Sequence, residues 1–175
     1  MGFSRIPMSG RLGVSWPAHP LYEAGPWYAR DVGVVILEEP GLVLDAYGVL
    51  PELDQLDVLK TERGRQDTSF TAVGYGLQRI NPVFVESEKI RMYAEPNLIQ
   101  INVPGFTGDF SLLLSNNHST GGTCFGDSGG PNFLDDGNVV AGVTSFGLNG
   151  NCAGTGGVFR MDRQDVLDFV SPFLE

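Results

Sequence analysis

The chain has 175 residues, of which 42% are hydrophobic and 18% are charged. This length and composition are typical of one globular domain with a sizeable core, and they exclude a disordered chain. The formal net charge of −10 argues against a nucleic-acid surface, because phosphate binding needs clustered lysine and arginine. No apolar run approaches the length of a membrane span, so we expect neither nucleic acid nor a membrane as a partner.

Short β-rich runs follow one another along the chain, separated by many of its 24 glycines and 11 prolines. These runs are Val32–Leu37, Phe70–Tyr75, Val83–Val85, Leu98–Val103, Phe110–Leu114, Val139–Phe146 and Gly157–Arg160. Their close spacing with turn signals predicts an all-β barrel or sandwich. Residues 51–68 are charged and irregular, which indicates a connection between two halves, and Asp135-Asp136-Gly137-Asn138 predicts a tight turn.

The C-terminus is the exception to this β pattern. Asp162 is predicted to cap a helix that runs from about Arg163 to Phe173. Apolar residues recur there at helical spacing and form one stripe, made of Val166, Phe169, Val170 and Phe173. We expect this stripe to pack on the barrel, with a partner-binding helix as the alternative.

The most informative motif is Gly126-Asp127-Ser128-Gly129-Gly130-Pro131. Glycines beside Ser128 leave room for a substrate carbonyl, because they have no Cβ and adopt conformations that other residues avoid. Consecutive amides in such a turn can point at one spot, as an oxyanion hole requires. The string therefore indicates a nucleophile turn, and the alternative is a glycine-rich hairpin turn with an incidental serine.

The candidate metal ligands are few. Cys124, Cys152, His19 and His118 are the only cysteines and histidines, and they show no metal-ligand spacing. We therefore expect no metal site and no cofactor. The segment Met1–Pro7 lacks the apolar core of a signal peptide.

Several motifs now align in one order. Asp31 opens an apolar run, and further downstream come Val73-Gly74-Tyr75-Gly76, Gly122-Thr123-Cys124-Phe125, the nucleophile turn, Val143-Thr144-Ser145-Phe146-Gly147, Cys152 and Gly157-Val158-Phe159. Over roughly residues 14–175 this series resembles the trypsin/chymotrypsin-like serine proteases, most closely their bacterial and fungal branches. The resemblance implies an all-β double antiparallel β-barrel with a C-terminal helix, as a single domain over residues 1–175. Residues 1–50 would be a remnant of the first barrel, 51–68 the connection, 69–160 the second barrel and 162–174 the helix.

The resemblance also implies catalytic roles. Ser128 would be the nucleophile, the amides of Gly126 and Ser128 would form the oxyanion hole, and Asp31 would orient the general-base imidazole. Asp127 resembles the residue that pairs with a free α-amino group in active members of the family. The alternative for Asp127 is that its carboxylate accepts from backbone amides within the turn.

A specificity pocket is implied as well. Gly122 aligns with the pocket floor, where a carboxylate would select Arg or Lys, and Gly147 and Gly157 align with the walls. An aromatic or other bulky apolar residue before the scissile bond is therefore expected. Ser145 and Phe146 would lie along the substrate backbone, although Phe146 fits a core role equally.

In the family the two cysteines that match Cys124 and Cys152 are bonded to each other. Such a disulfide would stabilise the chain by about 3–4 kcal/mol, and it would place the protein in an oxidising, extracellular setting. A reduced buried pair is the alternative.

The family's general-base string, Thr-Ala-Ala-His-Cys, does not occur in the sequence, and neither does an Ile-Val-Gly-Gly segment. His19 lies between prolines and His118 lies in a polar loop, so both are poor substitutes. We therefore expect an N-terminally truncated, secreted, monomeric serine endopeptidase that acts on proteins or peptides and meets protein inhibitors. This chain alone would be inactive. The alternatives are a non-enzymatic protease-like binding protein and a decayed, poorly folding product.

Overall fold

Strands dominate the computed structural model, which describes residues 12–26, 28–60, 68–81 and 84–174. The elements in chain order are β1 (Gly13–Ser15), β2 (Ile36–Leu37), the 3₁₀ helix η1 (Gln55–Leu59), β3 (Phe70–Gly74), β4 (Arg79–Asn81), β5 (Phe84–Glu86), β6 (Met92–Ala94), β7 (Leu98–Val103), β8 (Gly108–Asn116), β9 (Pro131–Leu134), β10 (Val140–Gly147), β11 (Gly154–Arg160), α1 (Gln164–Val170) and the 3₁₀ turn η2 (Ser171–Phe173). The predicted all-β class with one C-terminal helix is confirmed.

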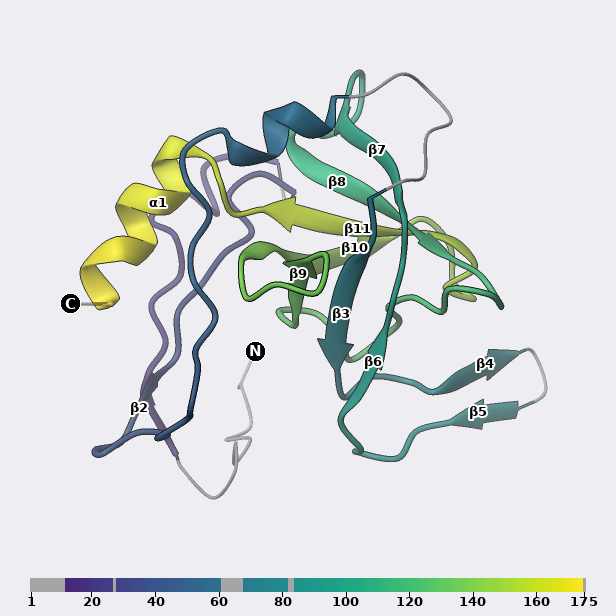
Figure 1. The fold of residues 1–175 in the computed structure, drawn as a ribbon, viewed down its shortest axis with the longest axis horizontal. Helices are drawn as coiled ribbons and strands as arrows, with labels where there is room; N and C mark the ends of the chain where they lie inside the picture. The colour runs from purple at the N-terminus through teal and green to yellow at the C-terminus, as the bar shows by residue number, and fades with distance from the viewer. Residues whose placement is uncertain (1–11, 27, 61–67, 82–83, 175) are drawn as a thin grey trace.

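The central sheet holds seven strands in the order β6-β3-β9-β10-β11-β8-β7, and its neighbours pair antiparallel. It curls round because β6 leads directly into β7 at its far edge (Figure 1). An antiparallel bridge between Ser69 and Asn97 and a hydrogen bond from Phe70 N to Pro96 O, 2.9 Å, join the start of β3 to this connection. The sheet is therefore strongly curled, in keeping with the predicted all-β fold.

Two apolar clusters fill the fold. The first lies within the curled sheet and gathers buried side chains from η1 and five strands, among them Leu56, Phe70, Leu112 and Val158. The second joins the end of β11 to α1 through Phe159, Met161, Val166 and Val170. Val166 and Val170 are buried and Phe169 packs against the cluster, so three residues of the predicted apolar stripe pack on the barrel, whereas Phe173 lies in η2 and is exposed.

The predicted cap of the C-terminal helix was wrong. The N-cap residue is Arg163, and it makes no side-chain capping bond. Asp162 is instead fully buried, and its carboxylate accepts from Leu56 N at 2.8 Å and from the Arg160 guanidinium at 2.7 and 2.9 Å. A buried guanidinium needs a paired anion more than a helix end needs a cap, so Asp162 faces inward.

Strand boundaries differ most in the N-terminal third. The run Val32–Leu37 contributes only β2, which pairs with β1, and a single bridge between Gly33 and Ala18. The strands β1, β4, β6 and β9 were not predicted, and part of the predicted run Val83–Val85 lies outside the described residues. The predicted turn at Asp135–Asn138 is confirmed, since it joins β9 to β10 and Gly137 N donates to Leu134 O at 3.1 Å.

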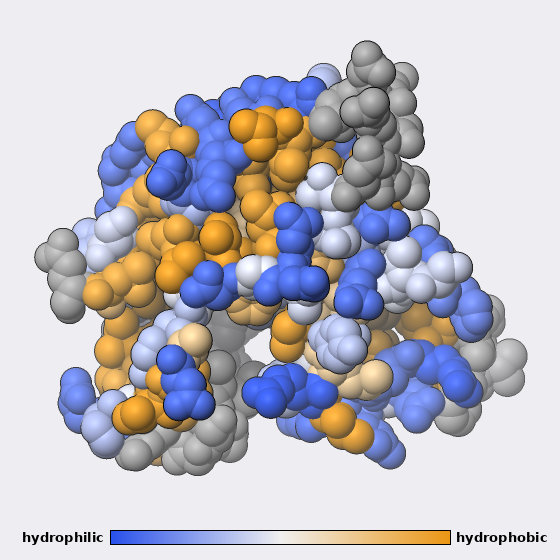
Figure 2. All heavy atoms as spheres, viewed as in Figure 1, coloured by the Kyte–Doolittle hydropathy of each residue, from blue (hydrophilic) through white to orange (hydrophobic). Residues whose placement is uncertain are grey.

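Apolar side chains reach the surface along the side that holds α1 and the β2 end (Figure 2). Val14, Trp16 and Val35 are among the large hydrophobic residues that are more than half exposed. None of the helices in the described part of the chain is both long and apolar enough to cross a membrane.

Candidate active site

The turn that carries Ser128 is held by its own backbone and by β10. Asp127 N donates to Cys124 O at 3.1 Å, and Gly130 N donates to Asp127 O at 2.8 Å. Gly129 N donates to Thr144 O at 2.8 Å, which fastens the turn to the neighbouring strand. Gly126 and Gly129 have φ angles of 98° and 82°, in the region that favours glycine.

This arrangement leaves the serine and two amides accessible. Ser128 is exposed. Within the described part of the chain, the amides of Gly126 and Ser128 have no hydrogen-bond acceptor, while the amides of Asp127, Gly129 and Gly130 are all engaged. The turn thus offers two unused donors beside one exposed hydroxyl.

Asp127 ties this turn to the end of β3. One carboxylate oxygen accepts from Gly76 N at 2.7 Å, and the other accepts from Cys124 N at 2.8 Å. Backbone amides therefore satisfy this carboxylate, one from the turn itself and one from Gly76 after β3, which the alternative interpretation of Asp127 did not include. The other interpretation needs a free α-amino group, and the N-terminal residues of this chain lie outside those described.

Asp31 reaches the same region from the N-terminal part of the chain. The hydroxyl of Ser145, on β10, donates to the carboxylate of Asp31, 114 positions away in sequence. Asp31 is half-buried and lies just before the bridge that Gly33 makes. Asp31 therefore contacts β10 at Ser145, next to Thr144, the residue to which the turn of Ser128 is hydrogen-bonded.

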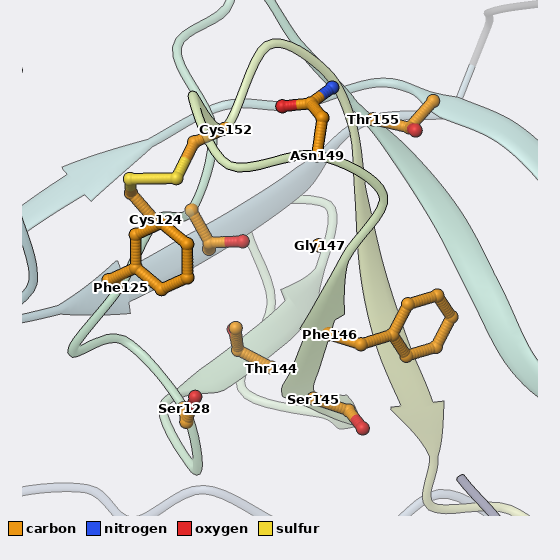
Figure 3. Close-up of a pocket in the computed structure, with 11 residues that line it drawn as sticks. Cys124, Phe125, Ser128, Thr144, Ser145, Phe146, Gly147, Asn149, Cys152 and Thr155 are labelled. Atoms are coloured by element: carbon orange, nitrogen blue, oxygen red, sulfur yellow. A yellow bond between two sulfur atoms is a disulfide. The ribbon is translucent and has the colours of Figure 1, made fainter. Parts of the chain in front are cut away.

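A cavity of about 270 Å³ opens beside Ser128 (Figure 3). Ser128 lies at one end and the disulfide between Cys124 and Cys152 lies at the other, with Gly147 between them. The predicted disulfide is present, with a Cα–Cα distance of 5.4 Å. Among the residues described, none of those that line this cavity is charged.

Two of the predicted pocket glycines do not line this cavity. Phe146 turns away from Ser128 in Figure 3, and a Cβ at Gly157 would overlap its ring. A Cβ at Gly122 would overlap the side chain of Asn116, whose amide donates to Thr123 O at 2.7 Å. Both glycines therefore make space for neighbouring side chains, and Phe146 combines packing with a place at the cavity.

Sequence reasoning missed Asn149 and Thr155, which also line the cavity. The amide of Asn149 donates to Ala153 O at 2.6 Å and accepts from Ala153 N at 3.1 Å, so it closes the loop that carries Cys152. The string Asn149-Gly150-Asn151 is a turn signal that points to such a loop. Thr155 gives no comparable signal, because its position depends on β11 pairing with β8.

Phe146 also continues into an aromatic cluster. Its ring meets that of Phe106 edge-on with centroids 5.6 Å apart, and Phe106 lies 5.5 Å from Tyr28. Phe106 is 41% exposed. An apolar surface therefore extends from the cavity across the β7–β8 turn towards the segment that carries Asp31.

Neither histidine meets the serine or the aspartate. His19 is buried at 7% exposure, its Nδ1 accepts from Leu21 N at 3.2 Å, and its ring packs 5.2 Å from that of Phe169. His118 is exposed in the turn after β8. Among the residues that the structure describes, neither forms a hydrogen bond with Ser128 or Asp31, and no three potential ligands gather at a metal site.

The sequence model of the family described as Trypsin matches residues 11–169. The chain belongs to the trypsin family. A comparison with curated protein sequences finds no match. The fold of the trypsin family is confirmed by the solved structures that the chain resembles.

A mutant of human heparin binding protein superposes with a TM-score of 0.66 at 16% identity, covering 94% of this chain and 65% of that one. HL collagenase superposes with a TM-score of 0.67 at 21% identity, covering 94% of this chain and 69% of that one. Neuropsin, a serine protease from mouse, superposes with a TM-score of 0.70 at 18% identity, covering 94% of this chain and 72% of that one. The chain thus spans about two thirds of the length of these trypsin-family structures.

Proposed function

We propose that this chain is the part of a serine endopeptidase that carries the nucleophile, Ser128. The observation that carries the proposal is the pair of amides, from Gly126 and Ser128, that have no acceptor among the described residues and flank an exposed hydroxyl. Because Gly126 and Ser128 are exposed, these two amides are accessible to a ligand. An oxyanion that forms on a substrate carbonyl is the ligand that two such donors suit.

The proposed reaction is acyl transfer. Ser128 Oγ attacks the carbonyl carbon of the scissile bond, and a histidine imidazole accepts the hydroxyl proton. The amides of Gly126 and Ser128 donate to the resulting oxyanion. When the carbon–nitrogen bond breaks, the amine leaves with the proton from the imidazolium. Water then attacks the acyl-enzyme ester, again through the imidazole, and regenerates Ser128.

We further propose that a segment outside these 175 residues supplies the histidine. The His19 ring packs against Phe169, and His118 lies exposed in the turn after β8. The similar solved structures are about half as long again as this chain. Asp31 is the acid that would orient the imidazole, since the Ser145 hydroxyl already fixes its carboxylate at the edge of β10. Without a base, Ser128 retains only what the oxyanion donors provide, so this chain alone would have little peptidase activity.

The cavity favours a bulky uncharged side chain before the scissile bond. Its lining has no charge that would pair with Arg or Lys, and burying an unpaired cation there would be costly. The aromatic surface of Phe146, Phe106 and Tyr28 continues from it and would contact apolar residues further along the substrate. We propose an aromatic or large apolar residue as the preferred one.

The Cys124–Cys152 disulfide supports an oxidising compartment, so we propose that the protein is secreted, as a monomer that meets protein substrates and protein inhibitors. A non-enzymatic binding protein is the alternative function, favoured by the positions of the two histidines. One similar structure is called a heparin binding protein. A polyanion is a poor ligand for this chain, because its own formal charge is −10.

Covalent labelling separates the two functions. The chain is incubated with a fluorophosphonate, which reacts with activated serines, in the presence of free imidazole, which stands in for the general base. The modified peptide is then identified by mass spectrometry. We expect the label on Ser128 and its loss in Ser128→Ala, while the control Ser119→Ala, at an exposed turn serine, labels like the wild type. Label spread over several serines, or none on Ser128, would favour the binding protein.

A further inference from the structure

We propose that Gln78 is a positioning residue for Ser128, which it holds in place through Gly76 and Asp127. This inference rests on the proposed function, since positioning matters only if Ser128 is the nucleophile. Gln78 joins the turn of Ser128 to the hairpin of β4 and β5. This hairpin extends away from the barrel beyond the end of β3 (Figure 1).

The Gln78 side chain closes the base of this hairpin. Its Oε1 accepts from Glu88 N at 2.7 Å, and its Nε2 donates to Glu88 O at 2.8 Å. Gln78 N also donates to Glu86 O at 3.1 Å. The carboxamide thus pairs with Glu88 as a neighbouring peptide group would, although β4 and β5 form a two-stranded sheet separate from the barrel.

The same Nε2 reaches towards the active site. It donates to Gly76 O at 2.6 Å, and Gly76 N donates to the carboxylate of Asp127 at 2.7 Å. The next residue, Leu77, donates its amide to Phe125 O at 3.0 Å. The two peptide groups on either side of the Gly76 Cα therefore lie between the hairpin base and the turn that carries Ser128.

The connection is tight at its centre. Gly76 is buried, and a Cβ there would lie 2.5–2.7 Å from the carboxyl atoms of Asp127. Since this segment packs directly on Asp127, a shift of Gly76 must move Asp127 or break its hydrogen bond. Gln78 limits such shifts because its amide donates to Gly76 O and so holds this segment in place.

The test compares three variants of the full chain by hydrogen exchange and mass spectrometry. Gln78→Met keeps the length of the side chain but removes all of its hydrogen bonds. Gln78→Lys keeps a donor for the Gly76 and Glu88 carbonyls and loses only the acceptor. Gln164→Ala is the control, because this exposed glutamine makes its hydrogen bond to Asp168 on α1, on a different element.

We expect amides of the peptide that spans residues 124–130 to exchange about tenfold faster in Gln78→Met, the fold-change typical of one lost hydrogen bond. Gln78→Lys and the control should match the wild type in this peptide. Peptides from β10 and β11 serve as the internal reference for global stability. If Gln78→Met speeds exchange only within residues 79–88, Gln78 merely closes the hairpin and the proposal is overturned.

The fluorophosphonate label provides the second readout. A positioning role predicts that Gln78→Met slows labelling of Ser128 and that Gln78→Lys restores the rate, whereas equal rates in all variants would contradict it. If the wild type takes no label even with free imidazole present, the proposed function fails. The exchange result then still decides whether the hairpin and the turn are coupled.

Discussion

Gly130 shows how narrowly the backbone around Ser128 is constrained. A Cβ at this position would lie 2.5 Å from Val73 O and 2.8 Å from Asp127 O. Both are backbone oxygens, which cannot turn aside as a flexible side chain can. The glycine therefore permits the close approach of the turn to β3, which in turn positions Asp127 against Gly76.

We predict that Gly130→Ala lowers the free energy of unfolding by about 2 kcal/mol, the usual cost of forcing an extra methyl group into a packed site. Gly150→Ala is the matched control, since nothing lies within 4 Å of a Cβ there, and it should leave stability almost unchanged. Urea unfolding measures both. Equal stability of the two variants would contradict the tight approach of the turn to β3.

Among the elements, η1 is fastened to the barrel by charges. Arg160, fully buried, pairs with Asp162 at 2.7 Å and with Asp57 of η1 at 2.9 Å. A hydrogen bond from Lys60 lowers the pKa of Asp57 below its ordinary value of 3.8; burial opposes this, and Arg160 adds to it. Although burial works against its charge, Asp162 and Asp57 raise the pKa of Arg160.

Because the pKa of Asp57 is lower in the folded chain, its contribution to stability is present above about pH 4 and is lost as the pH falls through the folded value. We predict that Asp57→Asn loses less stability than the wild type between pH 6 and pH 3. The control is Asp136→Asn, at an exposed turn residue, which should lose as much as the wild type. Denaturant melts at both pH values measure this, and parallel losses in all three would refute it.

The elements that the sequence predicted are those with a local signal. The strands β3, β7, β8, β10 and β11 are long apolar runs, and Val166 and Val170 recur at helical spacing. The strands β1, β4 and β6 are three residues long, so no alternation can develop before tertiary pairing decides them. In the sequence, Asp162 has the position of a helix cap. Its actual partner is the Arg160 guanidinium, and nothing in the sequence indicates that Arg160 is buried.

The candidate site divides in the same way. Ser128 and its glycines form one continuous string, and the order of motifs was enough to match Asp31 and Cys152. The sequence does not reveal that Phe146 lies over Gly157 or that Gln78 reaches Gly76, because each contact depends on how neighbouring strands and loops pack. These contacts required the structure.

For the molecule as a whole, exposed apolar side chains concentrate in the N-terminal third of the chain. Nearly half of the large exposed hydrophobic residues among those described lie before residue 54, although β1 and β2 together are only five residues long. Exposed apolar patches beside short, partly unpaired strands are binding or aggregation surfaces. This distribution fits the shorter length of the chain relative to the similar trypsin-family structures.

We therefore predict that polar replacements in this part of the chain improve solubility. Val14→Thr combined with Val35→Thr, at residues 60% and 54% exposed, should reduce binding of a hydrophobic dye and the amount of aggregate without lowering the melting temperature. Val166→Thr is the contrasting control. Because Val166 is fully buried, this substitution should lower the melting temperature. Unchanged dye binding in the double variant would show that these residues are already covered.

We propose that Ser128 and its oxyanion donors are in place in this chain and that only the general base is supplied from elsewhere. Free imidazole in solution can stand in for that base. We predict that the rate of fluorophosphonate labelling of Ser128 rises in proportion to the concentration of neutral imidazole, by about tenfold or more, and that Ser128→Ala stays unlabelled. A rate that does not respond to imidazole, or a label that remains in Ser128→Ala, would contradict the claim.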